Sequence, residues 1–399
     1  MQYLIAIAAL GGVGGVFAVI LVIAERYFIN YGQCEIDVNN GERKYTVEGG
    51  SSLLNALVEN KLFVPSACGG KGTCGYCKCK VLTEIGPILP TETGMLTRSE
   101  MKQNIRLSCQ IKVKFDLDIE VPEEYFAIQE FRTKLEKINQ VTPDIRELTF
   151  RLIEPDKIEF HAGKYVQVRV PRDEGIRAMH GKYAGMDFTN FDERQIDLEI
   201  IPREKYIYRG YSMSNAPGRD DIVELNVRIV PPPEGTNLPP GIATCWLWSL
   251  IEGDEIWLTG PYGEFFIKDT DRPCIFIGGG AGMAPMKSMI LELFEKKTKR
   301  DVKYYYGARA KKDLFYVDLF EKLAKENPNF EFITALSEPD PKDDWDGHTG
   351  FIHLIVEKTL KEFVGKEYYL CGPPLMVDAV IKMLHEKGVP DDDIAYDKF

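Results

Sequence analysis

The chain reads SACGGKGTCGYCKCK from residue 66 to residue 80, and this stretch decides the fold around it. Cys68, Cys74 and Cys77 are separated by five and then by two residues, and a fourth candidate, Cys109, follows in the sequence RLSCQ. This spacing is close to the plant-type pattern of a [2Fe-2S] cluster, whose first gap is one residue shorter. Glycines among the cysteines let the backbone turn tightly and direct N–H groups toward inorganic sulfide. We therefore predict that these four cysteines ligate a [2Fe-2S] cluster.

Two alternatives stay open for the cysteines. Four thiolates that include a two-residue gap also bind structural zinc, although the glycine-rich first gap favours iron and sulfide. Cys79 lies two residues beyond Cys77 on a strand predicted at residues 77–82, so the two side chains share one face of that strand. We interpret Cys79 as a buried thiol, because free cysteine usually behaves as a small apolar residue, and its alternative role is that of a rival fourth ligand.

Length, charge and cysteine count limit the class of protein. A chain of 399 residues predicts two or three domains, each with its own core. The net charge of -12 argues against a nucleic-acid partner, which needs a basic face. Nine cysteines, four of them with ligand spacing, fit a reducing compartment better than a disulfide framework.

The N-terminus carries an apolar run with no charged residue from Tyr3 to Ala24. A helix of this length spans about 33 Å at about 1.5 Å per residue, and the hydrocarbon core of a bilayer is about 30 Å thick. We therefore predict a transmembrane anchor within residues 1–30. A signal peptide is the alternative, but the run is too long and no basic residue precedes it. Gly11 and Gly15 form a small-xxx-small pair, which predicts contact with a helix of a partner membrane protein.

Residues 31–125 are expected to form a small α+β domain. Alternating residues flank an Asn-Asn-Gly turn at 39–41, which is typical of a β-hairpin. Ser51 or Ser52 is expected to cap a helix whose apolar residues recur at helical spacing. Alternation at 115–121 predicts a closing strand. With the cysteine loop, these elements resemble a β-grasp ferredoxin.

Residues 126–268 are rich in short β-branched runs broken by Pro and Gly, which predicts an antiparallel β-barrel. Two motifs within it indicate a flavin site. Residues 209–212 read Arg-Gly-Tyr-Ser and place a cation, an aromatic face and a hydroxyl on one predicted strand. Residues 239–244 read Pro-Pro-Gly-Ile-Ala-Thr and lead into a helix predicted at 245–251, whose first amides could hold a pyrophosphate.

Two further segments carry no predicted chemistry. Residues 83–106, after the cysteine loop, are interpreted as a connection with a short helix. Residues 172–208, within the predicted barrel, are interpreted as a loop insertion with a docking or lid role, or with no role.

Residues 269–399 are expected to form an α/β domain that binds a dinucleotide. A buried strand at 274–278 runs into a glycine turn at 279–285 and then into an amphipathic helix, which is half of a dinucleotide site although the spacing is not G-x-G-x-x-G. Later strands, each followed by a helix, predict a parallel sheet with ligands at the strand C-termini. Cys371 lies at the end of one of these strands, and the alternative to a functional role is that it is only a buried thiol. The candidate cofactor-binding residues here are Gly278, Gly279, Gly280, Gly282, Pro285, Gly372 and Pro373.

Taken in order, the anchor, the cysteine set, the Arg-Gly-Tyr-Ser motif, the glycine turn, Cys371-Gly-Pro-Pro374 and the terminal Phe399 resemble the F-subunit family of the sodium-translocating NADH:quinone oxidoreductases. The likeness covers essentially the whole chain. It implies a ferredoxin-like domain followed by a ferredoxin-NADP reductase-like pair, an FAD barrel and an NADH-binding domain. It also implies a single-pass protein of the bacterial inner membrane, with the soluble domains on the cytoplasmic side.

The resemblance implies a role for each motif residue. Arg209 would pair with the flavin phosphate, Tyr211 would stack on the isoalloxazine, and Ser212 would hydrogen-bond near flavin N5. The remaining implied positions are Gly241 and Thr244 at the pyrophosphate-binding turn, Cys371 near the nicotinamide, and Phe399 over the flavin face. Ser212, Cys371 and Phe399 are thus the candidate catalytic residues. The chain departs from the family pattern at Lys71, which interrupts the glycines, at the extra thiol Cys79, and in having no glycine tail after Phe399.

The resulting hypothesis is electron transfer from NADH through FAD to a [2Fe-2S] cluster and on to integral-membrane subunits of a quinone reductase complex. Quinone reduction and sodium transport would belong to those other subunits. One alternative is the NADH-dependent reductase component of an oxygenase, and a second is a non-enzymatic, membrane-tethered metal-binding scaffold. NADH is favoured over NADPH, because Arg309 is the only basic residue between Gly307 and Lys311, and Lys311 and Lys312 are interpreted as solvated.

Overall fold

The computed structural model describes residues 31–188, 205–232 and 238–398. The chain divides into two compact units, Met1–Ala127 and Ile128–Phe399, here called the N-terminal and the C-terminal unit. The predicted anchor and Phe399 lie outside the described residues. Among the residues that are described, no helix combines the length and the apolar character needed to cross a bilayer.

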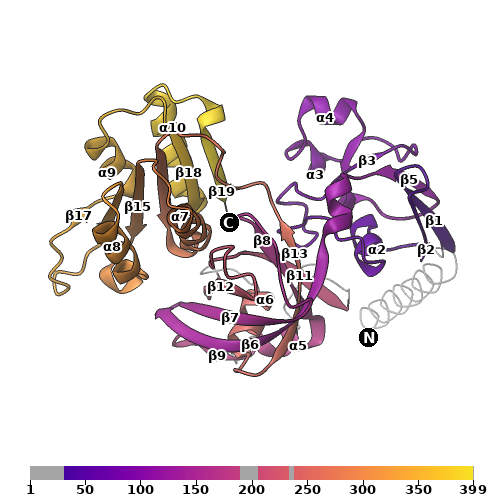
Figure 1. The fold of residues 1–399 in the computed structure, drawn as a ribbon. Helices are drawn as coiled ribbons and strands as arrows, with labels where there is room; N and C mark the ends of the chain where they lie inside the picture. The colour runs from indigo at the N-terminus through magenta and orange to yellow at the C-terminus, as the bar shows by residue number, and fades with distance from the viewer. Residues whose placement is uncertain (1–30, 189–204, 233–237, 399) are drawn as a thin grey trace, which may run out of the picture. The chain divides into compact units, whose positions relative to one another are not determined.

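The N-terminal unit contains a five-stranded sheet of order β2-β1-β5-β3-β4 (Figure 1). Strand β1 pairs antiparallel with β2 and parallel with β5. Asn39 and Asn40 adopt positive φ of 53° and 55° between β1 and β2, so the predicted hairpin is confirmed. The hydroxyl of Ser52 accepts a hydrogen bond from the backbone N–H of Asn55, which confirms the predicted cap of α2. The elements are β1 (Gln33–Val38), β2 (Arg43–Glu48), α2 (Leu53–Glu59), β3 (Lys78–Val81), α3 (Pro90–Thr93), α4 (Arg98–Lys102), β4 (Ile105–Leu107), η1 (Ser108–Gln110), β5 (Leu117–Glu120) and η2 (Glu123–Ala127).

The core of this unit lies between α2 and the sheet. Leu53 and Leu57 from α2 are fully buried in one cluster with Ile36 of β1 and Ile119 of β5. Each such side chain contributes about 1.5–3 kcal/mol relative to an exposed one. The cysteine loop between α2 and β3 is therefore held at both ends by packed elements.

The first sheet of the C-terminal unit is antiparallel throughout, with order β11-β8-β13-β6-β7-β12. A bridge between Met213 and Leu225 joins its two outer strands, so the sheet closes on itself as the predicted barrel. The elements are β6 (Gln129–Thr142), β7 (Ile145–Glu154), β8 (Tyr165–Pro171), α5 (Arg172–Ala178), β9 (Lys182–Tyr183), β10 (Met186–Asp187), β11 (Tyr206–Ser212), β12 (Ile222–Arg228), α6 (Ile242–Ser249) and β13 (Glu255–Tyr262).

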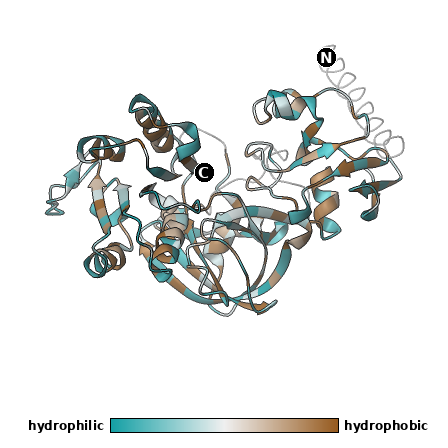
Figure 2. Cartoon of the chain, turned by 45° about the horizontal axis from the view of Figure 1, so that its top comes forward, coloured by the Kyte–Doolittle hydropathy of each residue, from teal (hydrophilic) through white to brown (hydrophobic). Residues whose placement is uncertain are grey.

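The second sheet of this unit is parallel, with order β17-β16-β15-β14-β18-β19, as predicted for the last domain. Its strands carry side chains into two cores: Phe276 of β14 belongs to one, and its neighbours Ile275 and Ile277 belong to the other. Figure 2 shows hydrophobic brown segments along these strands, interrupted by paler and teal ones. The elements are β14 (Cys274–Gly279), η4 (Gly280–Gly282), α7 (Met283–Glu295), β15 (Val302–Ala308), η5 (Lys311–Asp313), α8 (Val317–Glu326), β16 (Phe330–Leu336), β17 (His348–Thr349), α9 (Ile352–Thr359), β18 (Glu367–Gly372), α10 (Pro374–Glu386), η6 (Asp391–Asp393) and β19 (Ile394–Lys398).

Two sequence predictions about this unit were wrong in detail. The helix predicted at 245–251 is α6, which begins at Ile242 and ends at Ser249, because the backbone of Gly241 takes the N-cap position. The segment 172–208 is not only a loop insertion: its described part contains α5, the β9–β10 hairpin and the start of β11, and Ala178 and Met179 lie in the barrel core.

Candidate functional site

The cysteine loop brings the four predicted ligands together as two pairs. The sulfur atoms of Cys68 and Cys74 lie 3.4 Å apart. The thiols of Cys77, just before β3, and Cys109, in η1, are hydrogen-bonded to each other. Gly72 has φ of +74°, and a side chain there would meet the Gln110 amide at 2.7 Å. The flexible Gln110 side chain can move away from such a contact, so it is the positive φ that favours glycine at this position.

One member of each pair, Cys68 or Cys109, has thiolate character, which is the form of cysteine that binds metal, and the pKa of its partner, Cys74 or Cys77, is raised. The hydrogen bond from the Cys74 thiol, with smaller help from the backbone N–H of Thr73, lowers the pKa of Cys68 to about 4. The thiol of Cys77 likewise lowers the pKa of Cys109, and the Gln110 side chain adds to this effect. Among the described residues, no group of three or more His, Cys, Asp or Glu side chains is arranged so that it could hold a single metal ion. Two sulfur pairs fit a two-iron cluster, in which each iron takes two thiolates.

Cys79 lies in the core of the N-terminal unit, 2% exposed, and burial raises the pKa of its thiol to about 12. The pKa of Cys77 is also raised, but its first cause is the hydrogen bond with Cys109, whereas for Cys79 it is burial in the core. Cys79 therefore lies outside the two sulfur pairs and behaves as a small apolar side chain.

A buried ion pair supports the cluster loop from the segment that was predicted to be a plain connection. Glu92 of α3 is fully buried, and its carboxylate lies 2.6 Å from Nη2 of Arg106 on β4. The backbone N–H groups of Leu89 and Leu107 also donate to this carboxylate, at 2.9 and 3.0 Å. Burial raises the pKa of Glu92, but the hydrogen bonds from Arg106 and the backbone outweigh it and hold the pKa below its usual range. The segment 83–106 therefore anchors β4, which leads directly to Cys109.

We expect Glu92→Gln to destabilise the N-terminal unit by about 3–5 kcal/mol, because it leaves the Arg106 guanidinium buried without its counter-charge. The lowered pKa means that this stabilisation is present above about pH 4.5 and is lost as the pH falls through the folded-state pKa. Thermal unfolding measured across pH 3–7 checks both points. The matched control is Glu120→Gln, which breaks the exposed pair with Lys80 and should change stability by under about 1 kcal/mol. Equal melting temperatures for the two variants would contradict the prediction.

The predicted flavin motifs come together in the barrel. Residues 209–212 lie on β11, paired with β8, so Arg209 and Tyr211 share one side of the strand as predicted. The hydroxyls of Tyr211 and Thr244 lie 3.4 Å apart, which joins β11 to the first turn of α6. The start of α6 presents backbone N–H groups that a phosphate can accept from. This pairing links the two motifs that the sequence placed more than thirty residues apart.

The glycine turn after β14 is shaped by close backbone packing. Gly280 has φ of +57°, which a residue with a side chain adopts only with strain. A side chain at Gly282 would lie 2.2 Å from the carbonyl oxygen of Cys371, so α7 starts directly against the end of β18. Cys371 itself is fully buried, and burial raises the pKa of its thiol well above the usual range.

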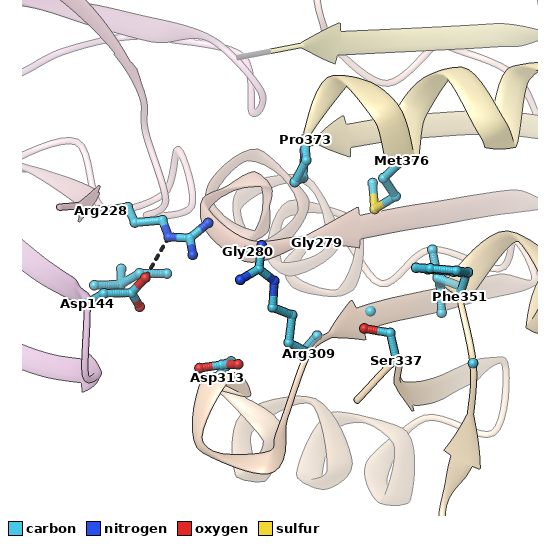
Figure 3. Close-up of a pocket in the computed structure, with 15 residues that line it drawn as sticks. Asp144, Arg228, Gly279, Gly280, Arg309, Asp313, Ser337, Phe351, Pro373 and Met376 are labelled. Atoms are coloured by element: carbon cyan, nitrogen blue, oxygen red, sulfur yellow. Dashed lines mark hydrogen bonds and ion pairs between the residues drawn. The ribbon is translucent and has the colours of Figure 1, made fainter. Parts of the chain in front are cut away.

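A pocket opens where the parallel strands end, beside the glycine turn (Figure 3). Arg228, at the end of β12, donates from Nε to Asp144 at 2.7 Å, and its Nη1 lies 3.7 Å from where a side chain on Gly280 would begin. Arg309, just after β15, extends toward the same turn from the other side (Figure 3). Two guanidinium groups that converge on a glycine turn and a helix N-terminus form a site for a phosphate-bearing ligand. The other lining residues are Ile145, Gly279, Gly307, Ala308, Asp313, Ser337, Gly350, Phe351, Ile352, Pro373 and Met376.

Two parts of the chain match known domain families. Residues 36–114 match the 2Fe-2S iron-sulfur cluster binding domain, and residues 276–382 match the oxidoreductase NAD-binding domain. The F subunit of the Na(+)-translocating NADH-quinone reductase of Actinobacillus succinogenes is 41% identical over 412 residues, which cover 100% of this chain and 99% of that relative. The F subunit of the same reductase of Pseudomonas aeruginosa is 42% identical over 396 residues, which cover 96% of this chain and 95% of that relative.

The chain belongs to the F-subunit family of the Na(+)-translocating NADH-quinone reductases.

Solved structures show the same architecture as this member of the F-subunit family. A cytochrome P450 reductase of Amycolatopsis aligns with a TM-score of 0.65 and 26% identity, over 92% of this chain and 98% of that one. The ferredoxin reductase of a carbazole 1,9a-dioxygenase aligns with a TM-score of 0.62 and 26% identity over the same shares. Reductases of other systems thus share the fold, whereas the higher identity is to the F subunits.

The structure places the predicted residues of this F-subunit chain in three groups. The cysteines lie in the N-terminal unit, and Arg209, Tyr211, Ser212, Gly241 and Thr244 lie on β11 and at the start of α6. Of the dinucleotide candidates, Gly279, Gly280 and Pro373 line the pocket, whereas Gly278, Gly282, Pro285 and Cys371 pack behind it and are buried. Sequence reasoning missed Asp144 and Arg228. No sequence signal pointed to them, because Asp144 lies in the turn between β6 and β7 and Arg228 ends β12, both in a part of the barrel with no nucleotide motif.

Proposed function

We propose that this chain is the electron-input subunit of a Na(+)-translocating NADH:quinone reductase, and that it takes electrons from NADH through FAD to a [2Fe-2S] cluster. The observation that carries the proposal is full-length identity of 41% to an F subunit of such a reductase, together with matches to a 2Fe-2S domain and a NAD-binding domain within one chain. FAD accepts two electrons together from NADH and releases them singly to the cluster. The zinc and scaffold alternatives are set aside, because both domain families are those of electron carriers and oxidoreductases.

The residues of the chain bind and orient these groups. Cys68, Cys74, Cys77 and Cys109 supply the four thiolates of the cluster. The pairing of the sulfur atoms and the thiolate character of Cys68 and Cys109 support this ligand set. Cys79 is left as a core thiol.

In the barrel, Arg209 binds the flavin phosphate, Tyr211 stacks on the ring system and Ser212 donates a hydrogen bond near flavin N5. The N-terminus of α6, with Gly241 at its cap and Thr244 in its first turn, holds the pyrophosphate. The contact between Tyr211 and Thr244 supports a single FAD spanning both motifs.

In the parallel-sheet domain, which we take to begin near residue 269, NADH lies over the strand ends with its pyrophosphate at the glycine turn between Arg228 and Arg309. Cys371 closes the site from behind near the nicotinamide. Phe399, which lies outside the described residues, would cover the flavin face that nicotinamide must reach.

Residues 3–24 anchor the chain in the membrane, and Gly11 and Gly15 contact a helix of a partner subunit. The anchor holds the electron-carrying domains at the cytoplasmic side of a bacterial inner membrane, beside the subunits that reduce quinone. The apolar sequence of this segment and the membership of the family support the assignment.

A truncated chain that begins at Asn30 tests this proposal against the oxygenase-reductase alternative. We expect it to bind FAD and the cluster and to reduce an artificial acceptor with NADH at the rate of the full chain. In membranes that lack this subunit, the full chain should restore NADH-driven quinone reduction and the truncated chain should not, because tethering supplies an effective concentration that diffusion does not. Failure of the full chain to restore quinone reduction would reject the proposed function. Equal restoration by both would reject the role of the anchor.

A further inference from the structure

A buried lysine joins the dinucleotide domain to the barrel. Lys287 lies on α7, and its side chain is only 9% exposed. Its ammonium group lies 3.1 Å from Oε2 of Glu147 on β7 and 3.0 Å from Oε2 of Glu224 on β12. It also lies 4.3 Å from the ring centre of Tyr316, which faces it from the end of the loop before α8. Both carboxylates belong to the barrel, whereas Lys287 and Tyr316 belong to the dinucleotide domain.

The carboxylates of this group, here called the Lys287 cluster, have a full set of donors. Glu147 accepts from Asn139 at 2.8 Å and from the Tyr316 hydroxyl, and Glu224 accepts from Arg219 at 3.0 Å. Burial raises the pKa of Glu147, but Lys287 and the Tyr316 hydroxyl outweigh it and hold the pKa below its usual range. An ammonium group buried with charged, hydrogen-bonded partners is tolerated, whereas one that loses its partners is costly.

The next residue on α7 makes a second bond to the barrel. The Ser288 hydroxyl donates to the carbonyl oxygen of Asn215 at 2.7 Å, and Asn215 follows β11, the strand that carries the flavin motif. Lys287 and Ser288 lie about one helical turn after Met283, where α7 begins behind the glycine turn, or about 6–8 Å at about 1.5 Å per residue. The second turn of α7 is therefore fixed to the barrel at two adjacent residues.

We propose that Lys287 is a positioning residue for the reaction between NADH and the flavin. By holding the second turn of α7 on β7 and β12, it sets where the start of α7 and the glycine turn before it, and with them the bound dinucleotide, lie relative to the flavin on β11. The inference rests on the proposed function, which places FAD in the barrel and NADH at the glycine turn.

If Lys287 contributed to stability alone, its removal would destabilise the protein without slowing flavin reduction in the molecules that still fold. Removing Lys287 alone leaves Glu147 and Glu224 buried without this counter-charge and is expected to lower stability, so the test measures the rate in the folded holoprotein. Hydrogen-bonded charges are more directional than apolar contacts, and a misplacement of about 1 Å in a reacting pair can reduce a rate by about 100-fold. The cluster should therefore affect the rate of flavin reduction more than the binding of either ligand.

The test compares Lys287→Met with the wild-type holoprotein in stopped-flow flavin reduction by NADH. We expect the rate constant at saturating NADH to fall about 10- to 100-fold, while the KM for NADH changes by less than about threefold and FAD content stays the same. The long-wavelength charge-transfer absorbance between nicotinamide and flavin should weaken. Amide hydrogen exchange in the second turn of α7 should quicken in the FAD-free chain as well. Lys287→Arg, which keeps the charge, should recover most of the rate.

The control is Lys296→Met at the end of the same helix, where the lysine is exposed and pairs only with Glu292, and its rate should equal that of the wild type. A rate for Lys287→Met within twofold of the wild type, with FAD bound, overturns the inference. If that variant does not fold, Tyr316→Phe decides: loss of the hydroxyl alone should slow flavin reduction about fivefold, and an unchanged rate overturns the inference. A wild-type flavin that NADH does not reduce would instead reject the proposed function.

Discussion

Replacing Cys109 with serine is expected to abolish the EPR signal of the reduced cluster, whereas replacing Cys79 with serine is expected to leave it intact. Cys109 lies in η1 beside the thiol of Cys77 and has the lowered pKa of a ligand thiolate. Cys79 is 2% exposed in the core and its pKa is raised to about 12. Iron content and EPR of the dithionite-reduced chain measure the result. NADH should still reduce the flavin in both variants, because the residues proposed for FAD and NADH lie in the other unit.

Cys34→Ser is the control for this comparison. Cys34 is as buried as Cys79, in the same core, but lies outside the cysteine loop, so it reports the effect of placing a hydroxyl in that core. A signal that survives Cys109→Ser and disappears in Cys79→Ser would make Cys79 the fourth ligand and overturn the assignment.

Much of the fold could be predicted because its signals are local. The hairpin at Asn39 and Asn40, the cap at Ser52 and the strand-turn-helix around Gly280 each depend on a few adjacent residues whose backbone geometry is restricted. The cysteine loop has the same property, because a cluster fixes the spacing of its ligands. The start of α6 was misplaced since Ile242 and Thr244 are weak helix formers, and packing in the barrel core outweighs that preference.

The residues that the sequence did not indicate act through contacts between distant segments. In the sequence, Glu92 resembles a surface residue of a short helix. The ion pair with Arg106 forms only when β4 takes its place beside β3. Lys287 occupies a regular helical position, and its two partners are 140 and 63 residues away along the chain. No local pattern distinguishes such charges from solvated ones, so they become visible only when the sheets are assembled.

The same reason hid Arg228, which lies with Arg309 at the pocket, and removal of either arginine gives the second large expected effect. We expect Arg228→Ala and Arg309→Ala each to raise the Kd for NADH about 10- to 100-fold, because a hydrogen bond to a charged group contributes about 1.5–3 kcal/mol. The double variant should lose about 10²- to 10⁴-fold if the two contributions are independent. The rate of flavin reduction at saturating NADH should change much less, since both side chains lie at the glycine turn, where we place the pyrophosphate.

Arg151→Ala is the matched control. Arg151 is a strand arginine of the same barrel, its side chain is 43% exposed compared with 39% for Arg228, and it is ion-paired, but it lies outside the pocket. Titration of each oxidised holoprotein with NAD⁺, and stopped-flow reduction over a range of NADH concentrations, separate binding from the reaction. An unchanged Kd in Arg228→Ala would show that the guanidinium serves only Asp144. The dinucleotide would then have to bind without a charge from the barrel, and the proposed pose at the strand ends would be wrong.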